Sequence, residues 1–358
     1  MKITGKILIL FIPLLFSQKA FSQDIHAEKM DDYIGYIQKN NLDIGSFSVF
    51  QKGKEVYFKS FGNIEKQKTN RNTTYQIGSV TKLFTAVLIF KLVEQHKISL
   101  NDPLSKYFPE VKNSGKITVK NLLEHSSGLN NYVKKDEKII WLKDPRTDQE
   151  IMQEIIGQRI LFSPDENVFY SNSGYYLLGK IIEKEYDKNY GEVLKEQLTK
   201  PFQLSQTKSA LENPKQITGS YIFERDAWQP AKDFYFKNIV GVGDISSSTE
   251  NLNRFINLLF NYKILSKETV DIMKPIIGKE TYGRGLMTFN FHAVDFYGNT
   301  GGTYGTNTIV IFDEKTDTSI TLIINGERYP RNEFIKDIVD IIYNNTIKFP
   351  ENADKNTY

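Results

Sequence analysis

The chain has 358 residues, 40% of them hydrophobic and 25% charged, which is the composition of a globular protein of one or two domains. It holds 46 Lys and Arg against 43 Asp and Glu with no block of like charge, so neither nucleic acid nor a strong electrostatic membrane surface is an expected partner. It contains no cysteine, which excludes disulfides and a lipid-modified N-terminal cysteine.

The first 22 residues have the pattern of a signal peptide. Two lysines precede an apolar core over 7–16, and the small residues Ala20 and Ser22 have the spacing of a cleavage site. A permanent membrane anchor is the alternative, but the core is too short to span a bilayer. We therefore expect a periplasmic or secreted protein with no stable membrane anchor after cleavage. The mature chain would carry 43 basic and 43 acidic residues and no net charge.

The remaining elements alternate between strand and helix patterns. Two alternating runs around Gly53 predict a hairpin, and the apolar spacing after Ser79 predicts an amphipathic helix that ends near 95–97. Helices and long loops follow from Asp102 to about Arg225. The last part predicts a helix, three strands and a terminal helix, at 252–260, 285–291, 306–312, 319–324 and 331–343.

This order of elements predicts an α+β fold. The expected α/β part comprises about 24–100 and 240–346, and the helical part about 101–239. Together they are expected to form one domain over 23–348. The polar tail, 349–358, is expected to be disordered.

Ser79 and Lys82 can together form a serine nucleophile without a histidine. A serine hydroxyl needs a base beside it, and positions three apart on a helix lie on one face. A lysine held there and partly removed from water has a lowered pKa and can accept the hydroxyl proton. The spacing recurs at Ser205 and Lys208, but that stretch is mostly polar and has no helical apolar period, so we attribute it to chance.

Three further stretches accompany this pair. Residues 169–179 contain Tyr170-Ser171-Asn172, residues 298–305 contain Asn299-Thr300-Gly301, and residues 122–129 read Leu-Leu-Glu-His-Ser-Ser-Gly-Leu. The pair Ser79 and Lys82 resembles the S-x-x-K element of serine β-lactamases and penicillin-binding proteins, and the first two stretches resemble their Y-x-N and K-T-G (or H-T-G) elements. The third stretch resembles the L-L-x-H-x-S-G-L sequence of the class C β-lactamase-related branch. The resemblance covers about 45–345. It implies a β-lactamase/transpeptidase-like fold, in which helices flank an antiparallel sheet that carries an all-helical insertion.

The resemblance also implies catalytic roles. Ser79 would be the nucleophile that forms an acyl-enzyme, and Lys82 would be its base. Tyr170 would have a pKa lowered by the lysine and would shuttle the proton to the leaving group. Asn172 would hydrogen-bond Lys82 and a substrate carbonyl.

The third element would bind substrate along a strand edge through Asn299, Thr300, Gly301 and Gly302. The backbone N–H groups of Gly302 and Ser79 would form the oxyanion hole. His125 is expected to be structural, at a helix end tied into the core. The four histidines have no ligand-like spacing, so we expect neither a metal nor another cofactor.

The expected function is that of a secreted serine hydrolase that cleaves an ester or amide in a small or peptidoglycan-derived substrate. The alternatives are a D-alanyl-D-alanine carboxypeptidase and a non-catalytic, penicillin-binding-like cell-wall binding protein. An α/β-hydrolase esterase is not supported, because no serine has a glycine two positions away on both sides.

One departure from the family concerns charge. Asn299 replaces the Lys or His that would help to hold a substrate carboxylate. This substitution favours ester or peptide substrates over β-lactams. Arg284, between two glycines on a predicted strand, is the candidate for supplying the missing charge.

Overall fold

The computed structural model describes residues 25–62, 69–135, 138–139, 144–212, 214–231, 235–275, 281–292, 294–347 and 349. The predicted signal peptide, 1–22, and nearly all of the predicted tail lie outside these ranges. Phe349 is described, and its ring centroid lies 5.2 Å from that of Tyr36. In the part of the chain that is described, no helix is both long and apolar enough to cross a membrane.

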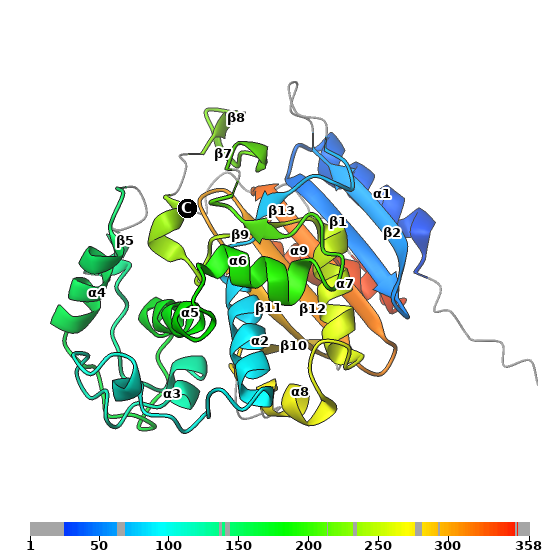
Figure 1. Ribbon diagram of the computed structural model, residues 1–358. Helices are drawn as coiled ribbons and strands as arrows, with labels where there is room; N and C mark the ends of the chain where they lie inside the picture. Colours follow the sequence, from blue (N-terminus) through cyan, green and yellow to red (C-terminus); the bar gives the residue numbers. More distant parts are fainter. Residues whose placement is uncertain are drawn as a thin grey trace, which may run out of the picture.

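The largest sheet combines strands from both ends of the chain (Figure 1). Its main path runs β10-β11-β12-β13-β1-β2, and the neighbouring strands on this path are antiparallel. The strands are β1 (Ile44–Gln51), β2 (Lys54–Phe61), β10 (Met287–Phe291), β11 (Val294–Gly302), β12 (Asn307–Asp313) and β13 (Thr318–Gly326). The hairpin predicted around Gly53 is confirmed as β1–β2.

Helices cover both faces of this sheet (Figure 1). One face packs against α1 (Ala27–Lys39) and α9 (Arg331–Ile342), and the other against α2 (Thr81–Glu94), α7 (Thr249–Phe260) and α8 (Lys267–Met273). Strand β12 serves both cores, because Ile309 and Ile311 face α1 and α9 while Val310 and Phe312 face the opposite core. The four residues from Ile309 to Phe312 are all apolar, because both faces of the strand are buried there.

The sequence predicted that helix α2 is amphipathic, and this prediction is wrong. Every residue from Thr81 to Phe90 is buried. The helix lies between the sheet and the helical part of the chain, so it has no solvent face, and helices of that kind are apolar on all sides.

The part between 101 and 239 is mainly helical but not all-helical. Its α-helices are α3 (Val119–Leu123), α4 (Asp148–Gly157), α5 (Asn172–Tyr186) and α6 (Tyr190–Leu194), and its shorter helical turns are η2 (Leu104–Lys106), η3 (Lys195–Thr199), η4 (Pro214–Gln216) and η5 (Phe236–Ile239). Its strands are β4 (Lys134–Lys135), β5 (Lys138–Ile139), β6 (Lys208–Ser209), β7 (Tyr221–Glu224) and β8 (Ala227–Pro230). Strands of two to four residues are too short to produce a recognisable alternation.

Two of these strands join the helical part to the rest of the molecule. Strand β7 pairs with β13 of the large sheet. Strand β6 pairs with β9 (Ile245–Ser247), which also pairs with β3 (Tyr75–Gln76) just before the predicted nucleophile. This small sheet holds the chain segment that leads into Ser79 in place.

Candidate active site

Ser79 lies in a tight turn, η1 (Gly78–Val80), at the start of α2. Gly78 has a φ of +50°, a conformation that favours glycine. A Cβ at this position would lie 2.7 Å from the carbonyl oxygen of Gly302. The turn and the end of β11 are therefore in direct contact, and this contact brings the first and third motifs together.

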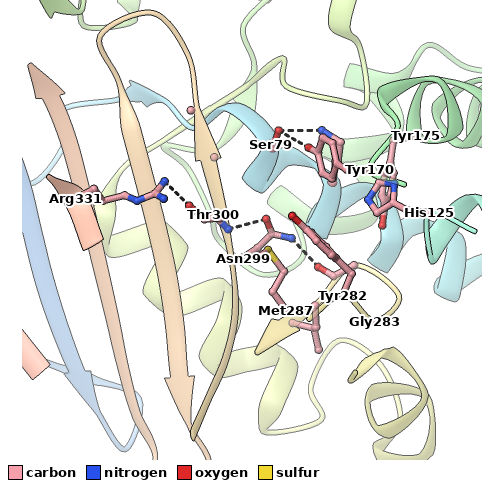
Figure 2. Close-up of a pocket in the computed structure, with 15 residues that line it drawn as sticks. Ser79, His125, Tyr170, Tyr175, Tyr282, Gly283, Met287, Asn299, Thr300 and Arg331 are labelled. Atoms are coloured by element: carbon pink, nitrogen blue, oxygen red, sulfur yellow. Dashed lines mark hydrogen bonds between the residues drawn. The ribbon is translucent and has the colours of Figure 1, made fainter. Parts of the chain in front are cut away.

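The hydroxyl of Ser79 has two polar side chains within hydrogen-bond distance (Figure 2). Lys82 Nζ lies 3.0 Å from Ser79 Oγ, and Tyr170 donates its hydroxyl proton to the same oxygen at 2.7 Å. A nucleophile within reach of a base and of a second proton-transfer group is the arrangement that covalent catalysis requires.

Lys82 is buried, with 2% of its surface exposed, and it lies near no carboxylate among its described contacts. Its amine donates to the carbonyl oxygen of Val242 at 3.0 Å and lies 5.0 Å from the centroid of the Tyr170 ring. Burial holds the pKa of Lys82 well below 10.5. This lowering favours the neutral form of the amine, which is the form that the predicted role of Lys82 as the base of Ser79 requires.

Tyr170 differs from the prediction in its acidity. Burial raises the pKa of its hydroxyl above 10.0, and the hydrogen bond with Ser79 offsets this rise only in part. The predicted lowering by lysine is wrong, because burial penalises the charged phenolate and, through the lowered pKa of Lys82, also disfavours the lysine charge that would stabilise it. Tyr170 is therefore a phenol that can donate a proton.

Asn172 is the first residue of α5, whose N-cap is Ser171. The predicted hydrogen bond with Lys82 is not formed, because the lysine amine bonds Val242 instead. Asn172 Oδ1 is buried without a hydrogen-bond partner. Asn172 is also absent from the side chains that line the cavity beside Ser79.

His125 packs behind Tyr170. Its Nδ1 accepts the N–H of Ser171 at 3.2 Å, and its ring centroid lies 4.6 Å from that of Tyr170 and 5.1 Å from that of Tyr175. Burial lowers the pKa of His125 to about 3, so the ring is neutral. These contacts suit a residue that positions Tyr170.

The end of β11 forms one wall of the site. Strand β10 pairs with β11 only as far as Gly298, so residues 299–302 have a free edge. The N–H of Thr300 bonds Asn299 Oδ1 at 2.7 Å and therefore points away from β12. In a strand, the N–H groups of residues two positions apart point to the same side. The N–H of Gly302 is therefore expected to face the same edge as that of Thr300, beside the nucleophile turn.

Asn299 is held within the protein through both of its polar atoms. Besides the bond with Thr300, its Nδ2 donates to the carbonyl oxygen of Gly285 at 2.8 Å. The side chain ties β11 to the loop that precedes β10. The side chain of Asn299 lines the cavity, and its amide group already forms these two hydrogen bonds within the protein.

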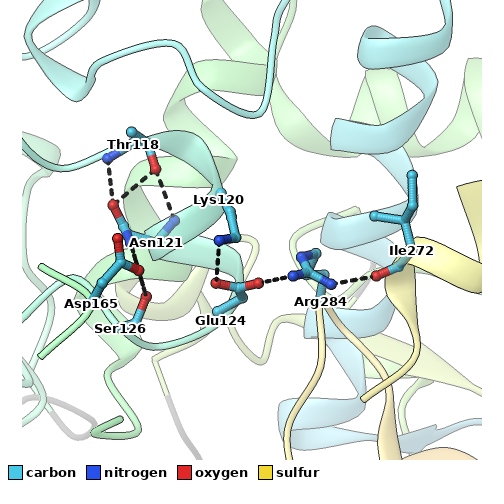
Figure 3. Close-up of polar contacts among 8 residues, drawn as sticks. All are labelled: Thr118, Lys120, Asn121, Glu124, Ser126, Asp165, Ile272 and Arg284. Carbon is cyan, nitrogen blue, oxygen red and sulfur yellow. Dashed lines mark hydrogen bonds and ion pairs between the residues drawn. The ribbon is translucent and has the colours of Figure 1, made fainter. Parts of the chain in front are cut away.

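Arg284 does not supply the charge that Asn299 lacks. Its guanidinium pairs with Glu124 and donates to the carbonyl oxygen of Ile272 at 2.7 Å (Figure 3). Lys120 lies 3.7 Å from the other carboxylate oxygen of Glu124. The prediction fails because Arg284 is neutralised by Glu124 and does not line the cavity, although Gly283 and Gly285 do.

The cavity is also lined by a basic side chain that the sequence did not reveal, that of Arg331. It is the first residue of α9, and its Nη1 donates to Thr300 Oγ1 at 2.5 Å. A predicted terminal helix gave no indication that its first side chain would reach the strand edge. That contact depends on how α9 packs against the sheet.

These residues surround a cavity of about 210 Å³. Of the eight predicted site residues, all except Asn172 line it. The described residues that line it are Ser79, Lys82, His125, Tyr170, Tyr175, Tyr282, Gly283, Gly285, Leu286, Met287, Asn299, Thr300, Gly301, Gly302 and Arg331. Within the described ranges, no group of three or more His, Asp or Glu side chains could hold a metal ion.

Comparison with known proteins gives consistent matches. Residues 36–342 match the family described as Beta-lactamase. The chain is 26% identical over 342 residues to a teichoic acid D-alanine hydrolase from Staphylococcus aureus, covering 94% of this chain and 81% of that protein.

Solved structures show the same fold. FmtA from Staphylococcus aureus has a TM-score of 0.75 and 26% identity over 90% of both chains. The D-amino acid amidase from Ochrobactrum anthropi SV3, in complex with D-phenylalanine, has a TM-score of 0.77 and 22% identity over 88% of this chain and 99% of that one.

Proposed function

This chain belongs to the β-lactamase family of serine hydrolases, and we propose that it hydrolyses D-alanyl esters, or related D-amino-acyl amides, through an acyl-enzyme on Ser79. The observation that carries the proposal is the placement of Ser79 Oγ within 3.0 Å of Lys82 Nζ and 2.7 Å of the Tyr170 hydroxyl. Burial lowers the pKa of the amine and raises that of the phenol, which favours a base and an acid beside one nucleophile.

In the first step, Lys82 takes the hydroxyl proton of Ser79 as Oγ attacks the ester carbonyl carbon. The electron pair of the C=O bond moves to its oxygen. The N–H groups of Ser79 and Gly302 would hold this oxyanion, a contribution of about 3 to 4 kcal/mol for one donor in another acyl-transfer enzyme.

In the second step, the bond between the carbonyl carbon and the alcohol oxygen breaks. The alcohol leaves with a proton from Tyr170, which regains one from Lys82. Water then attacks the acyl-serine, gives a proton to the same network and releases D-alanine, while Ser79 recovers its hydroxyl proton. The sum is one ester and one water converted to one acid and one alcohol.

The choice of acyl group rests on the relatives and on the size of the cavity. The matched relatives include a teichoic acid D-alanine hydrolase and a D-amino acid amidase. A cavity of about 210 Å³ is smaller than the roughly 300 to 1,000 Å³ of sites that enclose drug-sized ligands. This size favours a small acyl group such as D-alanyl over a bicyclic β-lactam. The signal-peptide pattern at 1–22 supports action outside the cytoplasm.

The test is intact-protein mass spectrometry with the D-alanyl and L-alanyl esters of glycerol, together with measurement of released alanine. We expect a D-alanyl adduct on Ser79, faster release of D-alanine than of L-alanine, and neither product with Ser79→Ala. Ser205→Ala is the matched control, because it removes the other serine that is followed three residues later by lysine. An adduct on another serine, or undiminished turnover by Ser79→Ala, would contradict the proposal.

A further inference from the structure

We propose that Asp244 is a positioning residue for the base of Ser79: it holds the turn at 241–244, and the Val242 carbonyl of that turn directs the Lys82 amine. The inference rests on the proposed acyl-enzyme on Ser79 and adds to it a residue that lies outside the described wall of the cavity. It follows from how the turn is anchored from two sides.

Lys82 needs a fixed partner because its amine sits on a flexible four-carbon stem. Its Nζ lies 3.0 Å from Ser79 Oγ and donates to the carbonyl oxygen of Val242 at the same distance. A neutral amine has one lone pair, and that lone pair must face the Ser79 proton for the transfer to occur. The bond with Val242 fixes one N–H of the amine, so the direction of this carbonyl determines where the lone pair can point.

Asp244 anchors the turn from the side of β6. Its side chain is fully buried; Oδ1 accepts the N–H of Gly241 at 2.8 Å, and Oδ2 accepts the hydroxyl of Ser209 at 2.7 Å. Gly241 has a φ of +72°, a conformation that favours glycine, so the carboxylate closes a tight turn. Hydrogen bonds to an ionised carboxylate are about twice as strong as those between neutral groups. Burial raises the pKa of Asp244 to about 6, so the ionised form is favoured above that pH.

The turn is anchored from the side of α2 as well. Thr85 Oγ1 donates to the carbonyl oxygen of Gly241 at 2.6 Å, so both backbone polar groups of Gly241 are bonded. The N–H groups of Val242 and Gly243 bond the carbonyl oxygen of Ile239 at 3.0 and 2.9 Å. The Val242 carbonyl belongs to the same planar peptide unit as the N–H of Gly243, and its direction therefore follows from these bonds.

Removing the Asp244 carboxylate would leave the N–H of Gly241 buried without its acceptor. The turn would then have to move to satisfy that group, and the Val242 carbonyl would move with it. A displacement of about 1 Å at a catalytic group can lower a rate about 100-fold. Asp244 thus acts on the reaction through Lys82 and not through substrate binding.

The experiment measures acylation by p-nitrophenyl acetate in stopped flow for the wild type, Asp244→Ala, Asp244→Asn and the control Asp313→Ala. The p-nitrophenolate leaving group needs no proton, and the acetyl group makes the test independent of the proposed D-alanyl substrate. Asp313 is the matched control, because it is buried and accepts the N–H of Lys315 at 2.8 Å and the hydroxyl of Thr316 at 2.7 Å, at the turn between β12 and β13.

We expect Asp244→Ala to lower the acylation rate constant about 10- to 100-fold with little change in the Kd of the ester. Asp244→Asn should keep most of the rate, because its amide oxygen can still accept the N–H of Gly241. Asp313→Ala should lower the Tm but keep the wild-type rate constant. A role in general stability alone would give neither the selective loss of rate nor the rescue by Asn.

An unchanged acylation rate constant in Asp244→Ala, or an equal loss in Asp313→Ala, would overturn the positioning role. So would a loss in Asp244→Asn as large as that in Asp244→Ala, because the charge and not the hold on the turn would then matter. If Asp244→Ala does not fold, Thr85→Val takes its place: it removes the bond to the Gly241 carbonyl and should lower the rate constant, and an unchanged rate constant would overturn the role. Failure of the wild type to release p-nitrophenol and to form an acetyl adduct on Ser79 would instead contradict the proposed acyl-enzyme.

Discussion

Gly301 lies so close to Ser79 that a Cβ at position 301 would be 2.6 Å from the Ser79 amide nitrogen and 2.2 Å from the carbonyl oxygen of Ile77. Both are backbone atoms, so no side-chain rotation can relieve the contact. The absence of a side chain at 301 therefore allows β11 and the nucleophile turn to approach each other. We expect this approach to bring the N–H groups of Ser79 and Gly302 together as the proposed oxyanion hole.

Gly301→Ala should separate the two N–H groups and lower the acylation rate at least about 100-fold, the effect of losing one oxyanion-hole donor elsewhere. Stopped-flow acylation with a chromogenic ester measures this rate. Gly115→Ala is the control, because a Cβ there would meet no atom within 4 Å. An acylation rate that Gly301→Ala leaves unchanged would show that close approach is not required.

Lys82→Met should abolish acylation and also change how stability depends on pH. Burial makes the pKa of Lys82 lower in the folded state than in the unfolded state, so the unfolded state binds more protons between the two values. Wild-type stability should therefore fall as pH decreases from 10.5 toward the folded pKa, while the Met variant lacks this loss. The Tm difference in favour of Lys82→Met should grow over that range and then level off. A difference that does not vary with pH would mean that the lysine is not buried neutral.

Tyr170→Phe should affect substrates according to their leaving groups. If Tyr170 donates a proton to the departing alcohol, the variant should lose about 10²- to 10⁴-fold in acylation by a D-alanyl glycerol ester. The p-nitrophenyl ester should lose much less, because its leaving group needs no proton. Equal losses on both esters would assign Tyr170 to the attack of Ser79 instead.

Asn299→Ala should mainly reduce stability. It leaves the carbonyl oxygen of Gly285 and the N–H of Thr300 without their partner, at a cost of about 1 to 3 kcal/mol for each buried group. Urea unfolding measures this loss. Asn290→Ala, which removes an exposed bond to Asp295 at 2.8 Å, is the control and should cost far less. A fully stable Asn299→Ala protein with altered substrate preference would show that the side chain acts on the substrate.

The Glu124–Arg284 pair should couple α3 to the loop before β10 (Figure 3). In a double-mutant cycle with Glu124→Gln and Arg284→Gln, we expect a coupling of about 0.5 to 3 kcal/mol in the free energy of unfolding. The exposed pair Lys267–Asp271 should give at most about 0.5 kcal/mol in the same measurement. Neither substitution should change the preference between charged and neutral esters. A changed preference in Arg284→Gln would restore Arg284 as the cation that recognises the substrate.

The sequence determined the features that depend on local spacing. Lys82 follows Ser79 by three positions, which places both on one face of a helix wherever that helix lies, and the distance of 3.0 Å between Lys82 Nζ and Ser79 Oγ confirms this. The β1–β2 hairpin and the terminal helix also follow local patterns, since alternation and apolar spacing are written into consecutive residues. The motifs that begin at Ser79, Tyr170 and Asn299 are far apart in the sequence. Their meeting in one site could be predicted only from the resemblance to a family.

Tertiary structure decided the charges of the site. Burial lowers the pKa of Lys82 on α2 and raises that of Tyr170, which precedes α5. The order of residues does not show that either side chain is buried. Arg284 and Arg331 are equally basic in sequence. One is paired with Glu124, while the packing of α9 brings the other to the hydroxyl of Thr300. The charge that a substrate meets depends on which residues distant in sequence lie within a few ångströms, because electrostatic interactions act through space and depend on local burial.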